Sequence, residues 1–209
     1  ASTVAQLIIE IGKNNLFLSL FLTMIMCLIL GMGIPTIPNY IITSAVAGPA
    51  LYELGVPLIV SHMFVFYFGI LADLTPPVAL ACFAAAPIAK ESGFKISLQA
   101  VRVAMAGFLI PYMAVYSPVL MLQGYNGDTL SFTVSFLYIL TKTIIAILLL
   151  GIAVIGHLKK EINAFERFFC LVIACFLITA LPITDEIAGG LLVIYLLMNW
   201  LKNKKVLAK

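Results

Sequence analysis

The chain has 209 residues, of which 63% are hydrophobic and 10% are charged, and its formal net charge at pH 7 is +3. Soluble domains carry about 25% charged residues, so this composition excludes an ordinary soluble fold around a single core. The few lysines and arginines flank apolar runs in short clusters, which argues against nucleic-acid binding and for a protein embedded in a lipid bilayer.

Eight apolar segments follow one another along the chain, and several reach the roughly 20 residues that a bilayer span needs. We therefore expect an all-α polytopic membrane protein. The segments cover residues 16–30, 37–54, 57–71, 76–90, 103–122, 132–156, 168–182 and 187–201. The chain opens without an initiating methionine or the basic region of a signal peptide, so we expect it to be the later part of a longer polypeptide.

The first two segments are separated by GMGIPTIP, a stretch that is unsuited to a continuous helix. Gly31 and Gly33 permit turns and close approach of the backbone. Pro35 and Pro38 each remove a helical N–H group, and Thr36 adds a hydroxyl group. The sequence therefore predicts a break in the helix at this point, deep inside an apolar run.

Residues 16–54 are too many for one simple span and few for two full ones, which favours a re-entrant helical hairpin with its tip near the middle of the membrane. Two short full spans are the alternative. Loop charge cannot separate the two arrangements, because both place the ends of the segment on the same side. Residues 57–90 are interrupted at ADLTPP, and we expect them to cross the membrane once as a broken helix.

In the second interruption, Pro76 and Pro77 stop the helix and Thr75 supplies a hydroxyl group. Asp73 adds a carboxylate, and an intramembrane carboxylate is a functional hypothesis by default. It could ligate a cation, carry a proton, or cap the half-helix that we expect to start near Thr75. His62, in the preceding segment, could relay protons, but a hydrogen-bonded interior histidine is the simpler interpretation.

Non-helical backbone is tolerated at membrane depth only inside protein or beside a water-filled cavity, so we expect the two interruptions to face each other. Each one exposes the carbonyl end of one half-helix and the N–H end of another. Carbonyl and hydroxyl oxygens suit a small hard cation such as Na⁺, and helix N-termini suit a carboxylate. Paired interruptions of this kind indicate the binding site of a secondary transporter. Two kinks satisfied by neighbouring helices are the alternative.

Short basic loops stay in the cytoplasm, which places residues 90–102, residues 157–167 and the C-terminus inside. Loops 123–129 and 182–186 contain no lysine or arginine and are then expected outside. Residues 94–104 have amphipathic spacing and form either an interfacial arm or the solvated end of the following helix.

The four cysteines lie inside apolar runs without zinc-binding spacing or nearby histidines, so we interpret them as small buried hydrophobic residues. They are Cys27, Cys82, Cys170 and Cys175. Further along the chain, Pro111 and Pro118 predict an irregular helix over residues 105–122, which serves packing or acts as a hinge.

Two stretches carry a resemblance to a known family: LILGMGIPTIPNYIITSAVAGPAL around the first interruption and HMFVFYFGILADLTPPVALACFAAAPIA around the second. Together they resemble the large permease subunit of tripartite ATP-independent periplasmic (TRAP) transporters. Within that family the chain looks most like the fused permeases that work with TAXI-type binding proteins. The resemblance is specific over residues 16–122, whereas residues 130–209 are similar only as generic membrane helices.

The resemblance implies an elevator-type secondary transporter in the cytoplasmic (inner) membrane of a bacterium or archaeon, multi-pass and with a cytoplasmic C-terminus. A periplasmic TAXI-type solute-binding protein would deliver a carboxylate-bearing solute. A Na⁺ gradient would drive its import, and no further cofactor is expected. The chain would hold the second of two inverted repeats, so the remaining permease repeat and the small-subunit helices are expected partners.

The motifs of the family fall on the two interruptions, which the resemblance implies line the ion and substrate region. They are Gly31, Gly33, Pro35 and Thr36 at the hairpin tip and Asp73, Thr75, Pro76 and Pro77 in the broken helix, with Na⁺ expected at Gly31, Gly33, Thr36, Asp73 and Thr75. Ile37 stands where a second hydroxyl group is often expected. This departure argues against a side-chain ligand there but not against backbone coordination.

We expect three parts in the chain. Residues 1–93 form half of a transport domain, with the hairpin at 16–54 and the broken helix at 57–90. Residues 94–129 form the amphipathic arm and a scaffold helix. Residues 130–209 form the C-terminal membrane helices, so that about four further membrane helices follow the broken helix.

The sequence argues against two other classes of function, an ion channel and an intramembrane enzyme. An ion channel or other pore would need a pore-lining ring repeated by oligomer symmetry, and the sequence presents no such filter. An intramembrane enzyme would need a nucleophile with its base, a metal motif or a carboxylate pair. Asp73 and His62 are the only candidates, and they would be about 16 Å apart on a continuous helix. We therefore expect no enzyme.

Overall fold

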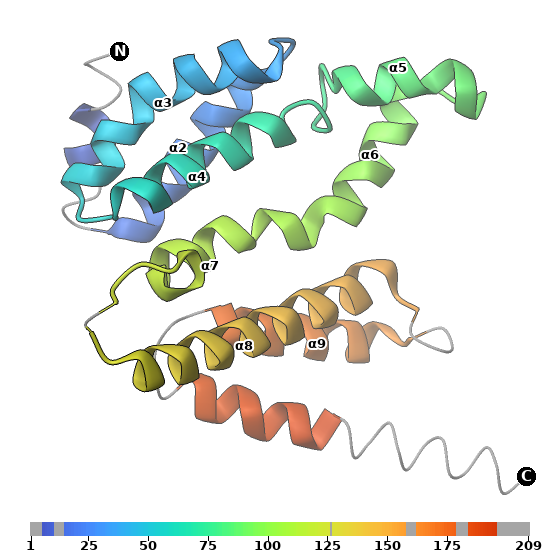
Figure 1. Ribbon diagram of the computed structural model, residues 1–209. Coiled ribbons are helices and arrows are strands. Elements are labelled where there is room, and N and C mark those ends of the chain that lie inside the picture. Colours follow the sequence, from blue (N-terminus) through green and yellow to red (C-terminus); the bar gives the residue numbers. More distant parts are fainter. Residues whose placement is uncertain (1–5, 11–14, 126, 158–161, 179–183, 196–209) are drawn as a thin grey trace, which may run out of the picture.

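The computed structural model describes residues 6–10, 15–125, 127–157, 162–178 and 184–195, and these ranges are helices joined by turns (Figure 1). The labelled helices are α2 (Leu16–Gly31), α3 (Thr36–Glu53), α4 (Leu58–Leu71), α5 (Leu80–Ala89), α6 (Gly93–Ala104), the 3-10 helix η1 (Met105–Phe108), α7 (Ile110–Tyr116), the 3-10 helix η2 (Pro118–Met121), α8 (Thr129–Ile155) and α9 (Ala164–Ile178). Residues 6–10 and 184–195 are helical as well. The expected all-α fold is confirmed.

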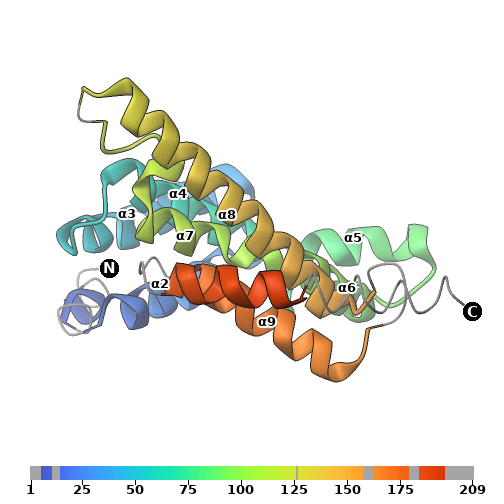
Figure 2. The same ribbon diagram turned by 90° about the horizontal axis from the view of Figure 1, so that it is seen from below.

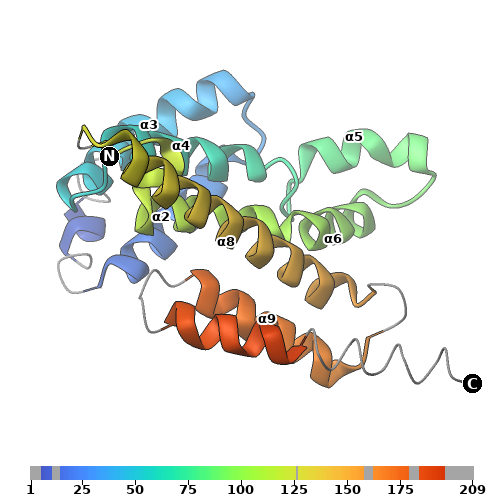
Figure 3. The ribbon, with the colours of Figure 1, turned by 60° about the horizontal axis from the view of Figure 1, so that its bottom comes forward.

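The helices form two groups along the chain. Figure 1 shows α2, α3 and α4 side by side, with α5 and α6 projecting to one side of them. α8 and α9 lie together in the second group, and α7 lies between the two groups. Seen from below, in Figures 2 and 3, the helix of residues 184–195 lies next to α9, and the N-terminal end of α8 extends beyond both.

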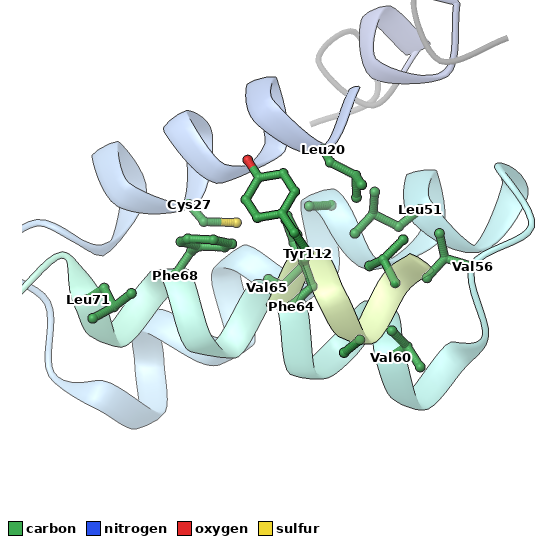
Figure 4. Close-up of a cluster of buried hydrophobic side chains, with 13 residues drawn as sticks. Leu20, Cys27, Leu51, Val56, Val60, Phe64, Val65, Phe68, Leu71 and Tyr112 are labelled. Atoms are coloured by element: carbon green, nitrogen blue, oxygen red, sulfur yellow. The ribbon is translucent and has the colours of Figure 1, made fainter. Parts of the chain in front are cut away.

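An aromatic cluster joins α7 to the first group. Phe64 and Phe68 on α4 contact the ring of Tyr112 on α7, with ring centroids 5.4 and 5.8 Å apart. Tyr112 is buried in a cluster of hydrophobic side chains with both phenylalanines (Figure 4). Its hydroxyl donates to the Met24 sulfur on α2 at 3.4 Å. Aromatic pairs of this edge-to-face kind add to the stabilisation that burial alone provides. The cluster holds α2 and α4 in fixed register around the two interruptions.

Local capping explains where several helices start and end. Asn15 accepts from the Leu18 amide at the start of α2, and Asp128 accepts from the amides of Leu130 and Ser131 at the start of α8. α8 ends at Ile155, and the next residue, Gly156, has a φ of +75°. A glycine in this left-handed conformation commonly follows the last residue of a helix. These caps set the 27-residue length of α8.

One described helix, α8, is both long and apolar enough to cross a membrane, while α2, α4 and α5 are apolar but shorter. The prediction of a single membrane helix over residues 103–122 is wrong, although its expected irregularity is confirmed. The range contains the end of α6, two 3-10 turns and α7, which has seven residues. Pro111 and Pro118 each lack the N–H that a continuous helix would need, and Ser117 leaves the helical conformation between them.

The predicted amphipathic segment is α6. The Ser92 hydroxyl accepts from the Lys95 amide and caps the helix. The Lys95 ammonium donates to Glu91 at 2.8 Å, and this bond, followed by one from the Ser92 amide, holds the pKa of the Glu91 carboxyl below its ordinary value. The Glu91 carboxylate is therefore charged at neutral pH, as suits a loop in water. The cytoplasmic position of the loop stays a prediction.

Three of the four cysteines are buried as expected, namely Cys27, Cys82 and Cys170. The prediction is wrong for Cys175, which is exposed because it lies on the side of α9 that faces away from α8. The basic C-terminal stretch and part of loop 157–167 lie outside the described residues.

Candidate functional site

The first predicted interruption is the connection between α2 and α3. α2 ends at Gly31, residues 32–35 are non-helical, and α3 begins at Thr36. Gly33 adopts φ +73°, in the left-handed region that glycine enters without steric cost. The predicted break is confirmed, with glycine in the turn and Pro35 at the start of the next helix.

The second interruption separates α4 from α5 and covers residues 72–79, which form turns and bends. It contains a cis peptide bond between Pro76 and Pro77. The break is confirmed, but the expectation that the helix resumes near Thr75 is wrong, because α5 begins at Leu80. Neither proline can donate a backbone hydrogen bond, so the regular helix starts only after both.

The two interruptions lie against each other, as expected. A Cβ atom added to Gly31 would lie 2.6 Å from the Gly69 carbonyl oxygen and 2.9 Å from Ala72 Cβ. A Cβ atom on Gly33 would lie 3.6 Å from Val78 Cγ1. The end of α2 therefore touches the end of α4 through backbone, at a distance that only glycine permits.

Asn39, which the sequence did not single out, joins the first turn of α3 to the last turn of α4, next to the two interruptions. Its side-chain nitrogen donates to the Gly69 carbonyl at 2.7 Å, and the residue is only 2% exposed. The side-chain oxygen Oδ1 is buried and has no hydrogen-bond partner among the described residues. The sequence feature that could have identified Asn39 is its amide side chain within an apolar run, one helical turn after Pro35.

Asp73 lies within the second interruption and does not cap α5. The residue before α5 is Ala79, and no side chain caps that helix. The Asp73 backbone carbonyl accepts from the Ala81 amide at 3.2 Å, whereas its buried side-chain oxygen Oδ1 has no partner in the described part of the chain. The capping alternative for Asp73 is therefore wrong, and ligation of a cation or carriage of a proton stays open.

The other predicted residues are arranged less tightly. Four of them are exposed at the interruptions, namely Gly33, Pro35, Thr36 and Pro77, and Pro76 is half-buried. The Thr75 hydroxyl donates to the Leu71 carbonyl at 2.8 Å, so it is occupied by its own helix. Within the described residues, no hydrogen bond joins the Thr36 side chain to the second interruption. The close contacts thus run through Gly31 and its neighbours rather than through the threonines.

His62 is a hydrogen-bonded interior histidine, as the simpler interpretation predicted. Its Nδ1 lies 2.9 Å from the Tyr40 hydroxyl, and the two rings pack with centroids 6.0 Å apart. The imidazole Nε2 approaches Gly48, where an added Cβ would lie 3.6 Å away. His62 therefore ties α4 to α3 beside the interruptions.

Substitution of Gly33 tests the backbone conformation of the first interruption. Because Val78 leaves room for a Cβ, we expect φ, not space, to limit the residue, at a cost of about 1–3 kcal/mol for a β-branched side chain. Gly33→Val should reduce solute uptake by the complete transporter at least fivefold, whereas Gly33→Asn, which tolerates positive φ, should retain most of it. Uptake and melting temperature measured side by side check this. Equal behaviour of Gly33→Val and wild type would contradict it.

Hard oxygen atoms dominate the chemistry of this region. The unpartnered oxygen of Asp73 lies in the second interruption, and that of Asn39 lies beside Gly69, in the last turn of α4. A buried polar atom without a partner costs about 1–3 kcal/mol, so each is a candidate ligand for a cation that prefers oxygen. α3 and α5 both begin here without a side-chain cap, although in α5 the Ala81 amide already donates to the Asp73 carbonyl. The positive end of α3 is therefore the more available of the two to an anion.

A comparison with protein families matches residues 1–128 to the family described as "Tripartite ATP-independent periplasmic transporter, DctM component". The matched range contains both interruptions and ends just before α8. Neither the curated proteins nor the solved structures contain a match to the chain.

Proposed function

Because this chain belongs to the DctM component family of TRAP transporters, we propose that it forms part of a permease that imports carboxylate-bearing solutes by Na⁺ symport. The family comprises non-enzymatic secondary-transport permeases of the cytoplasmic membrane, multi-pass and dependent on a periplasmic binding protein and further subunits. Because the members of this family are secondary transporters, the family membership argues against the alternative function as an ion channel. We propose Na⁺ as the coupling ion, a carboxylate-bearing solute, and a site at the two interruptions.

The observation that carries the proposal is the contact of Gly31 with the Gly69 carbonyl, which brings two non-helical segments together. Unwound backbone is stable in a bilayer only where protein or bound polar groups satisfy it. The partnerless oxygens of Asn39 and Asp73 support a cation between the segments. Gly31, Gly33 and Thr36 would contribute carbonyl oxygens, and Thr75 its hydroxyl oxygen, whose lone pairs stay free while its hydrogen is donated to Leu71.

The carboxylate of the solute would bind at the N-termini of α3 and α5. Neither helix has a side-chain cap, and Pro35, Pro76 and Pro77 set the position of these ends. Pro38 lacks an N–H, so the donors of α3 would be the amides of Thr36 and Ile37. Ile37 stands where a second hydroxyl residue is often expected, and its apolar side chain is compatible with a carboxylate site formed by backbone amides.

We further propose that α2 and α3 form a re-entrant hairpin, that α4 and α5 form one broken crossing, and that both move together as an elevator. The expected partners are a TAXI-type binding protein, the other permease repeat and the small-subunit helices. The C-terminus would lie in the cytoplasm. Uptake by the full-length complex with its binding protein, under separately imposed Na⁺ and proton gradients, tests this. Accumulation driven by the proton gradient alone would overturn Na⁺ coupling.

Asp73→Asn tests the carboxylate within this site. If the charge of Asp73 ligates Na⁺, the variant should need at least tenfold more Na⁺ for half-maximal uptake, since an amide is a weaker ligand than a carboxylate. The maximal rate should fall less, because the amide keeps the shape of the side chain. Initial rates against Na⁺ concentration provide the measurement. An unchanged Na⁺ dependence would remove Asp73 from the proposed ion site.

A further inference from the structure

Beyond the family-matched range, α8 contains one charged residue, Lys142, at its midpoint. Thirteen residues separate it from Thr129 and thirteen from Ile155, or about 20 Å of helix in each direction. The hydrocarbon core of a bilayer is about 30 Å thick. If α8 spans the membrane, Lys142 therefore lies close to its centre, where an unpaired ammonium is costly.

Lys142 has a partner on the helix of residues 184–195. Its ammonium donates to Asp185 Oδ1, and the Tyr138 hydroxyl, one turn earlier on α8, donates to Asp185 Oδ2 at 2.9 Å. The side chains of the ion pair are only 8% and 17% exposed. Both carboxylate oxygens of Asp185 therefore accept hydrogen bonds from side chains near the midpoint of α8.

The position of α9 explains how Asp185 reaches this depth. α9 has 15 residues, a length of about 22 Å, against about 40 Å for α8. Its buried residues pack on the C-terminal half of α8 only. This contact involves Ala146, Leu149, Leu150 and Ala153 of α8 and Cys170, Ile173, Ala174 and Leu177 of α9. The described part of α9 therefore covers the C-terminal half of α8, and Asp185, seven residues after Ile178, reaches the level of Lys142.

The helix of residues 184–195 then runs back along α9. Ala188 and Tyr195 belong to the same buried cluster, and the Tyr195 ring lies 6.4 Å from that of Phe169, in the first half of α9. Figures 2 and 3 show the two helices side by side, with the N-terminal end of α8 beyond them. The chain thus approaches the middle of α8 and returns toward the end from which it came.

We propose that α9 and residues 184–195 form a re-entrant hairpin that enters the membrane from the C-terminal end of α8 and is held at mid-depth by the Lys142–Asp185 ion pair. The acidic residues at the start of the second helix then lie inside the membrane, not in the external loop that the absence of basic residues predicts for 182–186. Loop charge cannot detect the difference, because residues 157–167 and the C-terminus share one side in both arrangements.

The surroundings of the pair fit a membrane-embedded charge. Intramembrane charges face the protein interior or a cavity and pair with one another. A cavity of about 670 Å³ borders Lys142 and Asp185, and the hydroxyl groups of Ser117, Ser135 and Tyr138 lie along its wall. Loss of one partner would leave the other charge uncompensated, which is far more costly than replacement of both.

Charge substitutions in the full-length permease test the pair. Lys142→Met or Asp185→Asn alone should lower the yield of folded, membrane-inserted protein at least tenfold. The double variant K142M/D185L and the exchange K142D/D185K should recover it to within threefold of wild type. The matched control is Glu186→Gln, an exposed carboxylate next to Asp185 on the wall of the same cavity, which should not lower the yield. If Asp185→Asn were as harmless as Glu186→Gln, or if neither double variant recovered, the ion pair would be overturned.

The depth of the hairpin has a separate test that does not require disruption of the pair. A maleimide carrying a polyethylene glycol chain too large to enter the membrane is applied from the outside to Glu186→Cys and to Tyr125→Cys, and labelling above that of the unmodified protein is measured. Tyr125 is exposed in the loop expected outside. We expect Glu186→Cys to react at least tenfold more slowly. Equal rates would place residues 184–186 in an external loop and would overturn the re-entrant arrangement.

Discussion

Replacement of Gly31 by alanine is expected to abolish transport by the complete permease while leaving membrane insertion intact. The added Cβ would lie 2.6 Å from the Gly69 carbonyl oxygen, a backbone atom that cannot rotate away, and 2.9 Å from both Ala72 Cβ and the Asn39 side-chain nitrogen. α2 and α4 must separate to admit it, and overpacking of this kind costs about 1–3 kcal/mol. The new Cβ also presses on the Asn39 side-chain nitrogen and disturbs its hydrogen bond to the Gly69 carbonyl.

The control for this prediction is Gly151→Ala in α8, since an added Cβ there meets no atom within 4 Å. Alanine also favours a helix over glycine, so that variant should be neutral or slightly stabilising. Initial uptake rates, normalised to the amount of protein in the membrane, should fall at least tenfold for Gly31→Ala and less than twofold for Gly151→Ala. Near-normal uptake by Gly31→Ala would show that the close contact is not required for transport.

The interruptions could be predicted from the sequence because glycine and proline act locally. Pro35, Pro76 and Pro77 forbid helical hydrogen bonds wherever the chain places them, and Gly33 alone suits its positive φ. That the two breaks meet followed from a general constraint, because unwound backbone needs a polar partner in a bilayer. These expectations required no knowledge of tertiary contacts.

The roles of particular polar side chains could not be predicted in the same way. Asn39 is recognisable only when Gly69, 30 residues further along the chain, is seen to lie against it. The capping role considered for Asp73 failed because the start of α5 is set by both prolines, nine residues after the end of α4. Loop charge likewise could not reveal that Asp185 contacts Lys142, since the contact joins residues 43 positions apart.

Asn39→Ala is expected to have the second large effect, because the amide connects α3 to α4 beside the two interruptions. Its removal takes from the Gly69 carbonyl the shorter of two hydrogen bonds, since the Ala72 amide also donates to that oxygen at 3.3 Å, and it empties the space where the amide packs against Gly31 and Gly69. Together these losses cost about 1–3 kcal/mol. Thr43→Val is the matched control. Thr43 is equally buried one turn further along α3, but its hydroxyl donates to the Asn39 carbonyl of its own helix, which already accepts a helical bond. That variant should lose less than about 1 kcal/mol, the net value of an ordinary hydrogen bond.

The effect of Na⁺ on the melting temperature separates a bracing role of Asn39 from a binding role. A ligand that binds only the folded protein raises its stability with concentration. If Asn39 Oδ1 is an ion ligand, Asn39→Ala should melt at a lower temperature and should also lose most of the Na⁺-dependent rise that wild type and Thr43→Val display. If the amide only braces α3 against α4, the variant should start lower but gain the same rise. Because Oδ1 is buried and has no partner among the described residues, while the amide nitrogen is already bonded to Gly69, we expect the first result.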